Sequence, residues 1–122
     1  ALVGPQIIDR LGGARTETAR TQIRNIESAL QLYKLDNYRY PSTDQGLEAL
    51  VEKPTISPIP RNWKSGGYLK QLPVDPWGNP YLYIYSNGGY EVFSYGADGE
   101  EGGEGDAKDI SSKDGDSSSG DE

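Results

Sequence analysis

The sequence predicts an α+β fold, in which one long N-terminal helix packs on a small antiparallel β-sheet and a glycine-rich acidic loop follows the sheet. Residues 14–37 contain no glycine or proline and carry apolar side chains at helical spacing. Farther along, two runs of alternating apolar residues flank Asn87-Gly88, a strong hairpin signal. The length of 122 residues suits a single domain.

The expected helix covers about residues 6–37. Its apolar side chains recur in alternating steps of four and three along one face: Ala19, Ile23, Ile26, Leu30 and Tyr33. We expect Ala29, Leu32 and Leu35 to widen this stripe, so that the C-terminal half is buried against the sheet. Four arginines keep the N-terminal half polar, and this half is expected to protrude: Arg10, Arg15, Arg20 and Arg24.

An apolar stretch at residues 1–8 precedes the polar part of the helix. It is too short to cross a bilayer, which takes about 20 helical residues. It is either a frayed terminus or the last turns of a longer apolar segment.

The middle of the chain is expected to be a loop over residues 38–66. Ser42 or Thr43 could cap a short helix over 46–52, and prolines at 54, 58 and 60 exclude regular structure after it. Strand signals begin after Gly67 and become strong at 81–85 and 90–95. Trp77 is expected to seal the core between helix and sheet; exposed together with Trp63, it would instead suit a carbohydrate-binding module.

The segment from Ser94 to Ser112 combines many carboxylates with five glycines at 96, 99, 102, 103 and 105. Calcium takes oxygen ligands from a backbone that wraps around the ion, and this composition supplies both. It also suits a solvated acidic tail. An EF-hand is excluded, because counting from Asp98 puts Gly102 at position five and Asp109 at position twelve.

Composition excludes several functions. Residues 98–122 hold ten acidic and two basic side chains, a balance of −8, whereas residues 1–97 have a balance of +1. The chain therefore lacks the basic surface that a nucleic-acid partner needs. With no His and no Cys, thiolate and imidazole metal sites and Ser-His or Cys-His pairs cannot form. A hydrolase with two carboxylates is the remaining enzymatic option, and the sequence singles out no such pair.

Four blocks of sequence, in order over about residues 1–112, resemble the major pseudopilin family, the G-type subunit of the bacterial type II secretion system. The blocks are LDNYRYPSTDQGLEAL (residues 35–50), PRNWKSGGYL (60–69), LPVDPWGNPY (72–81) and SYGADGEEGGEG (94–105). The nearest rival is a type IV pilin, although the paired cysteines that many such pilins carry are absent.

The resemblance implies a type IV pilin-like domain over residues 1–112. Residues 113–122 contain no apolar side chain and are expected to be a disordered acidic tail. It implies a structural subunit, not an enzyme, that polymerises in the periplasm and helps to move folded proteins through the outer-membrane secretin. The implied partners are further copies of the chain, minor pseudopilins, the inner-membrane assembly platform and prepilin peptidase. The full-length protein would be anchored in the inner membrane, with an N-terminus methylated after processing; the chain as it stands would be soluble.

The family's acidic loop binds calcium, and the resemblance carries its ligands onto Tyr95 (through its carbonyl), Asp98, Asp109 and Ser111. Asp106 and Ile110 are weaker candidates. The sequence departs from the family after Ser112, where an expected aromatic residue is missing. The last ligand of the site is therefore open.

Overall fold

A long helix, α1, spans Pro5–Asn37 and confirms the helix expected over about 6–37. The structure, a computed structural model, describes residues 5–96 and 110–113, and describes side chains from residue 14 onward. At 33 residues, α1 is about 50 Å long. Proline suits its first position because no helical partner is lost there. The helix ends where Tyr38 turns to a positive φ of 68°.

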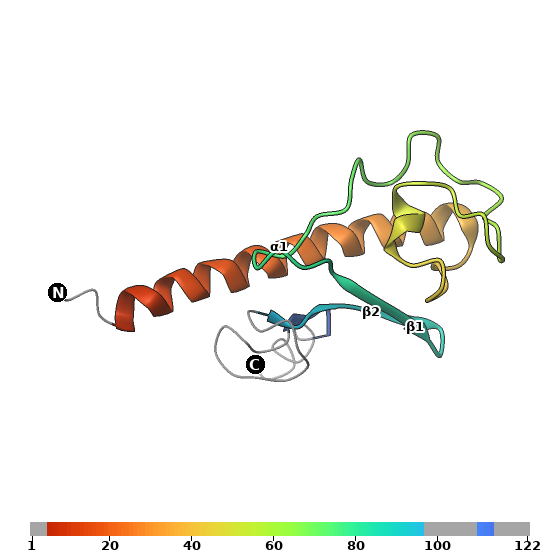
Figure 1. The fold of residues 1–122 in the computed structure, drawn as a ribbon. Coiled ribbons are helices and arrows are strands. Elements are labelled where there is room, and N and C mark those ends of the chain that lie inside the picture. The colour runs from red at the N-terminus through yellow and green to blue at the C-terminus, as the bar shows by residue number, and fades with distance from the viewer. Residues whose placement is uncertain (1–4, 97–109, 114–122) are drawn as a thin grey trace.

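The first half of α1 extends beyond the sheet, and the second half packs against the rest of the chain (Figure 1). The predicted apolar stripe is the buried face: Ala19, Ile23, Ile26, Ala29, Leu30 and Tyr33 are each at most 3% exposed. The expectation for Leu32 and Leu35 was wrong, since they are 46% and 73% exposed. Each lies two residues beyond a buried position, or about 200° around the helix, and therefore faces away from the sheet.

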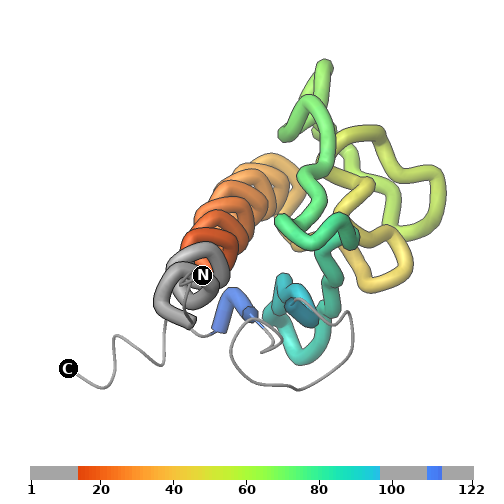
Figure 2. The backbone as a smooth tube through the Cα atoms, turned by 60° about the vertical axis from the view of Figure 1, so that its left-hand side comes forward, coloured from red at the N-terminus to blue at the C-terminus, as the bar shows by residue number. Residues whose placement is uncertain are grey.

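The sheet has three antiparallel strands in the order β1 (Leu82–Ser86), β2 (Gly89–Ser94) and β3 (Ile110–Ser111). The β1–β2 turn is the predicted one: Asn87 and Gly88 both have positive φ, 52° and 79°, as the favoured hairpin turns require. Val92 and Ile110 are buried, and both β2 and β3 contact α1. The sheet thus runs along one side of the helix (Figure 2).

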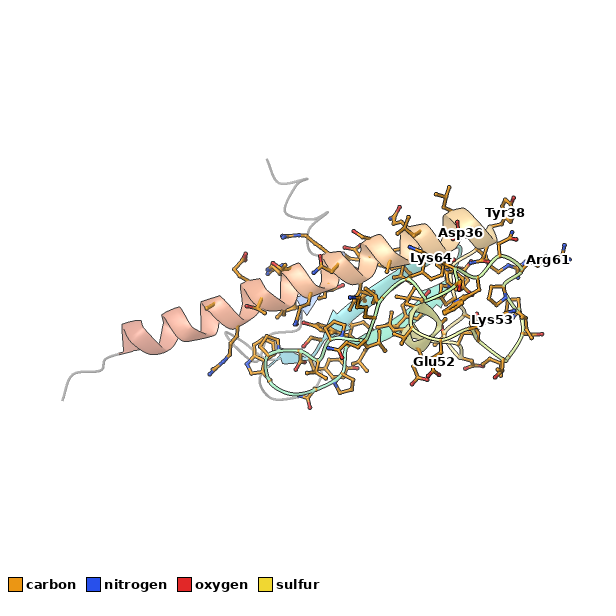
Figure 3. The ribbon with its side chains drawn as sticks, turned by 90° about the horizontal axis from the view of Figure 1, so that it is seen from above. Asp36, Tyr38, Glu52, Lys53, Arg61 and Lys64 are labelled. Carbon is orange, nitrogen blue, oxygen red and sulfur yellow. The ribbon has the colours of Figure 1, made fainter. Side chains whose placement is uncertain are left out.

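Residues 38–81 cover the second half of α1 with little regular structure (Figure 3). A 3-10 helix, η1, spans Leu47–Leu50. The predicted side-chain cap was wrong: Gly46 is at the cap position, and Ser42 Oγ instead accepts a hydrogen bond from the Gln45 N–H at 3.1 Å.

Between Gly67 and the start of β1 at Leu82 no strand forms, contrary to expectation, and the backbone makes only an isolated bridge between Val74 and Pro80. The amides of Tyr68 and Leu69 both donate to the Leu50 carbonyl, at 2.7 and 3.0 Å, so this segment is tied to the end of η1 instead of to a neighbouring strand. Gly67 adopts a φ of 86° at the turn.

Both tryptophans pack against the core, as expected for Trp77. Trp63 Nε1 donates to the Ala49 carbonyl at 2.8 Å. The buried Nε1 of Trp77 has no hydrogen-bond partner among the described residues. The paired exposed rings that a carbohydrate-binding surface would use are therefore not formed.

Candidate functional site

The two ends of the acidic loop are held together by the sheet. Ser94, the last residue of β2, pairs with Ile110, the first residue of β3. Beyond this pair, the Ser112 amide donates to the Val92 carbonyl at 2.8 Å, and the Val92 amide donates to Ser112 Oγ at 3.0 Å. Ile110 is 3% exposed and anchors β3 in the core. The loop is therefore closed at its base, as a compact ion-binding loop requires.

A buried carboxylate, Asp75, fixes the start of the loop. Its Oδ1 accepts the backbone amides of Trp77 and Asn79, at 3.1 and 2.8 Å. Its Oδ2 accepts the hydroxyl of Ser94 at 2.7 Å, and Ser94 Oγ in turn accepts the Gly96 amide at 3.0 Å. Asp75 is 3% exposed, so this network links the 75–79 turn directly to the residue from which the loop departs.

Tyr95 lies at the start of the loop, beside a cavity of about 230 Å³ that Asp75, Asn79, Pro80 and Leu82 also line. Its ring contacts Phe93, with the ring centroids 5.5 Å apart.

At the other end of the loop, the hydroxyl of Ser111 donates to Glu91 Oε2 at 2.5 Å and accepts the Lys113 amide at 3.1 Å. Glu91 therefore brings a carboxylate next to one of the predicted ligands. The sequence analysis did not identify Glu91, and its place opposite the loop's end follows from strand pairing alone.

Of the four predicted calcium ligands, Tyr95 and Ser111 are described and flank the closed base of the loop; Asp98 and Asp109 lie outside the described residues, as does the weaker candidate Asp106. Within residues 14–96 and 110–113, no group of three or more His, Cys, Asp or Glu side chains is arranged to hold a metal. The ligand set therefore stays a prediction.

The network at Asp75 was missed by sequence reasoning. Its signal was present, since an Asp followed by Pro, Trp, Gly and Asn is typical of a turn in which the side chain accepts the following amides. What the sequence could not show is that Ser94, far along the chain, supplies the third hydrogen bond.

A second candidate site is the N-terminal half of α1, which extends beyond the sheet. Arg15 and Arg24 are exposed, and Arg20 is half-buried with its Nε 3.8 Å from Glu17 Oε2. Among the side chains described from residue 14 onward, the first buried one is Ala19. No helix in the described part of the chain is long and apolar enough to cross a membrane.

This architecture defines the class of pilin-like filament subunits. The solved structure of the major pseudopilin from the type 2 secretion system of enterohaemorrhagic Escherichia coli matches it with a TM-score of 0.78 and 39% sequence identity, covering 92% of this chain and 97% of that one. The family model for protein G of the type II secretion system matches residues 6–113. The chain belongs to that family.

Curated relatives agree with this assignment. The type II secretion system core protein G of Pseudomonas aeruginosa is 54% identical over 112 residues, covering 90% of this chain and 79% of the relative. Core protein G of Vibrio cholerae is 53% identical over 112 residues, covering 90% of this chain and 76% of the relative. Identity at this level extends over helix, middle segment and sheet together.

Proposed function

We propose that this chain is the major structural subunit of a type II secretion pseudopilus and that it polymerises through α1. The observation that carries the proposal is the shape of the subunit. The part of α1 before Ala19 extends beyond the sheet, and the side chain of Arg15, on this part, is exposed. A helix that extends past its own domain offers a surface for neighbouring subunits.

In this role the chain is structural and not catalytic. Its partners are further copies of itself, minor pseudopilins, the inner-membrane assembly platform and the secretin, and prepilin peptidase acts on its precursor. The domain works in the periplasm, where growth of the filament helps to drive folded proteins through the secretin. Family membership and the solved pseudopilin structure support these assignments.

We further propose that the loop binds calcium through the Tyr95 carbonyl, Asp98, Asp109 and Ser111. Carboxylate, hydroxyl and carbonyl oxygens are the ligands that calcium prefers. The described residues fit such an ion in two respects: the loop is closed by the Ser94–Ile110 pair, and the Ser111 side chain lies beside the Glu91 carboxylate. A bound ion would hold the carboxylates of the loop together without mutual repulsion.

A chimera tests the assembly function. In a P. aeruginosa strain that lacks its own core protein G, this chain would replace the matched region of the relative, and export of a native exoprotein and the formation of pili on overproduction would be measured. We expect both to be restored. As a control, Leu30→Asp should abolish both by disrupting the core, because Leu30 is fully buried. A chimera that accumulates as a folded protein and restores neither would contradict the proposal.

A further inference from the structure

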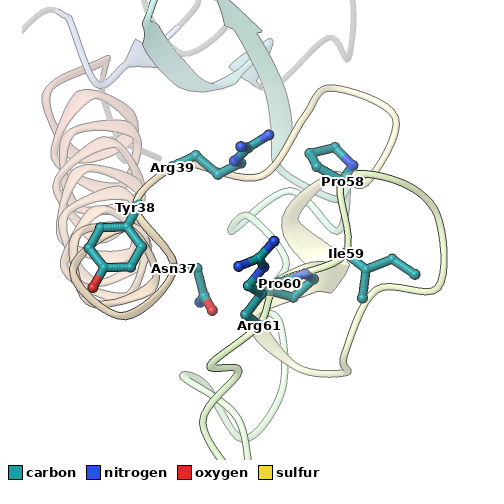
Figure 4. Close-up of a pocket in the computed structure, with 7 residues that line it drawn as sticks. All are labelled: Asn37, Tyr38, Arg39, Pro58, Ile59, Pro60 and Arg61. Atoms are coloured by element: carbon teal, nitrogen blue, oxygen red, sulfur yellow. The ribbon is translucent and has the colours of Figure 1, made fainter.

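A groove lies at the C-terminal end of α1, at the opposite end of the helix from its protruding half. It has a volume of about 350 Å³, and its walls come from two segments, residues 37–39 and residues 58–61. Figure 4 shows the side chains of Arg39 and Arg61 extending into the space between these segments. Pro58, Ile59 and Pro60 form the apolar part of the lining.

Two amide side chains hold the walls in place. On one side, Asn37 is 7% exposed; its Oδ1 accepts the Asn62 amide at 2.9 Å, and its Nδ2 donates to the Tyr33 carbonyl at 3.0 Å. On the other side, Gln45 is also 7% exposed, and its Nε2 donates to the carbonyls of Ile56 and Pro58, each at 2.8 Å. The groove is therefore a preformed part of the fold, although its walls contain no regular strand.

The charge of the groove is not balanced. Arg39 and Arg61 are exposed, and within the part of the chain that the structure describes neither guanidinium has an ion-pair partner. The carboxylate of Asp36, near the end of α1, accepts the Tyr68 hydroxyl at 2.8 Å instead. Two guanidiniums beside one groove favour an anionic occupant, because planar guanidinium groups bind carboxylates through paired hydrogen bonds.

We propose that this groove binds the acidic segment 114–122 of a second copy of the chain. That segment contains four carboxylates and otherwise only glycine and serine: Asp114, Asp116, Asp121 and Glu122. Small residues between the carboxylates let an extended backbone lie in a narrow groove, and the charges of the two surfaces are complementary. Because this is a contact between subunits, the inference rests on the proposed function as a filament subunit.

Distance favours a second copy over the chain's own segment. Ser112 lies beside Arg20, Arg24 and Glu27 of α1. Between Arg24 and Asn37 the helix rises about 20 Å. Asp116 follows Ser112 by four residues, which span at most about 14 Å, so only the later carboxylates, Asp121 and Glu122, could reach the groove of their own chain, and the four cannot occupy it together. In a neighbouring copy, this limit does not apply.

Paramagnetic relaxation in a mixed sample tests the proposal. The chain has no cysteine, so Ser118→Cys gives one site for a nitroxide label on an otherwise native chain. Nitroxide-labelled chain at natural isotope abundance would be mixed at low salt with ¹⁵N-labelled chain that carries no nitroxide. Broadening of the ¹⁵N signals then reports only contacts between copies. We expect the strongest broadening at the amides of Tyr38, Arg39, Ile59 and Arg61.

Matched variants separate the groove from general charge attraction. Arg39→Glu with Arg61→Glu in the ¹⁵N chain should lower the relaxation enhancement at the groove at least about fivefold, since it reverses the local charge. Lys53→Glu with Lys70→Glu changes the net charge equally at two exposed positions outside the groove lining, and should leave the relaxation enhancement at the groove unchanged. Replacing the four carboxylates of the nitroxide-labelled chain by amides should also remove the relaxation enhancement at the groove.

Three results would overturn the proposal: no broadening at the groove, equal losses in the arginine pair and the lysine pair, or broadening of the groove only within one chain. The last is measured with a spin-labelled ¹⁵N chain diluted into unlabelled chain at natural abundance. The measurement is made on the chain in solution, so its failure would leave the proposed filament function standing, and failure of the chimera would leave this contact standing.

Discussion

Asp75 gives the sharpest test of how the loop is supported. Replacing it by alanine would leave three donors without their acceptor: the amides of Trp77 and Asn79, and the Ser94 hydroxyl. The two amides are partly buried and should cost about 1 kcal/mol each, whereas the bond from Ser94 is buried and should cost about 1.5–2 kcal/mol. Asp75→Ala should therefore lower the free energy of unfolding by about 3–4 kcal/mol.

Asp75→Asn keeps the shape and one acceptor oxygen, and should cost only about 1–2 kcal/mol, because the bonds lose their charged acceptor. The assay is urea unfolding followed by circular dichroism at pH 7, in which an m value of about 1–3 kcal/mol/M converts the alanine effect into a midpoint shift of about 1–4 M. Asp44→Ala is the matched control, because Asp44 is exposed and should change stability by about 0.5 kcal/mol or less.

A stability of Asp75→Ala equal to that of Asp44→Ala would refute this reasoning, since it would mean that the three donors find other partners at no cost. An equally large loss of unfolding free energy in Asp75→Ala and Asp75→Asn would refute the expectation that one acceptor oxygen preserves most of the stability. It would show that the turn needs both oxygens of the charged carboxylate, because asparagine retains only one acceptor.

Calcium at a hundredfold excess over its dissociation constant should stabilise the domain by about 2.7 kcal/mol; an unchanged melting curve on adding EGTA to calcium-loaded protein would count against the site. Asp98→Ala should remove most of that effect and Glu100→Ala little of it, as measured by calorimetric titration; equal losses would indicate a diffuse acidic attractor. Burial, and then the neighbouring Tyr68, raise the pKa of Tyr33 from 10.0 to about 12. The folded state therefore favours the neutral phenol, and this contribution to the free energy of unfolding is complete below pH 10 and is lost between pH 10 and 12. Tyr33→Phe should make alkaline unfolding curves fall less steeply in that range, and an unchanged slope would contradict the assignment. A chain ending at Ser112 should fold and bind calcium as before. In the chimera, Arg15→Glu should impair filament formation while changing the free energy of unfolding by about 0.5 kcal/mol or less. Normal filaments from this variant would show that the helix face around Arg15 is only solvated.

The elements that depend on a local or periodic sequence pattern were predictable from the sequence. The spacing of Ala19, Ile23 and Ile26 identified the buried face of α1, because helix geometry alone sets which positions share a face. The hairpin followed from Asn87-Gly88, because few residues adopt two successive positive φ angles.

The parts that depend on distant partners were not predictable. Leu32 and Leu35 are apolar, but they are exposed because they lie on the side of α1 that faces away from the sheet. Strand propensity after Gly67 yielded to hydrogen bonds with Leu50, which lies outside any strand. At the loop, the carboxylate pattern identified a candidate ion site, but the Asp75–Ser94 contact joins residues that no local pattern relates.

The length of α1 has a mechanical consequence. From Pro5 to Ala19, the first buried residue among the side chains described from residue 14 onward, the helix rises about 21 Å. A tilt of about 5° where the helix meets the core would displace its beginning by about 2 Å, more than a close-packed contact tolerates. Small substitutions among Ala19, Ile23 and Ile26 would therefore change the direction of the protruding helix, and with it the pitch of an assembly, in addition to lowering the stability of the subunit.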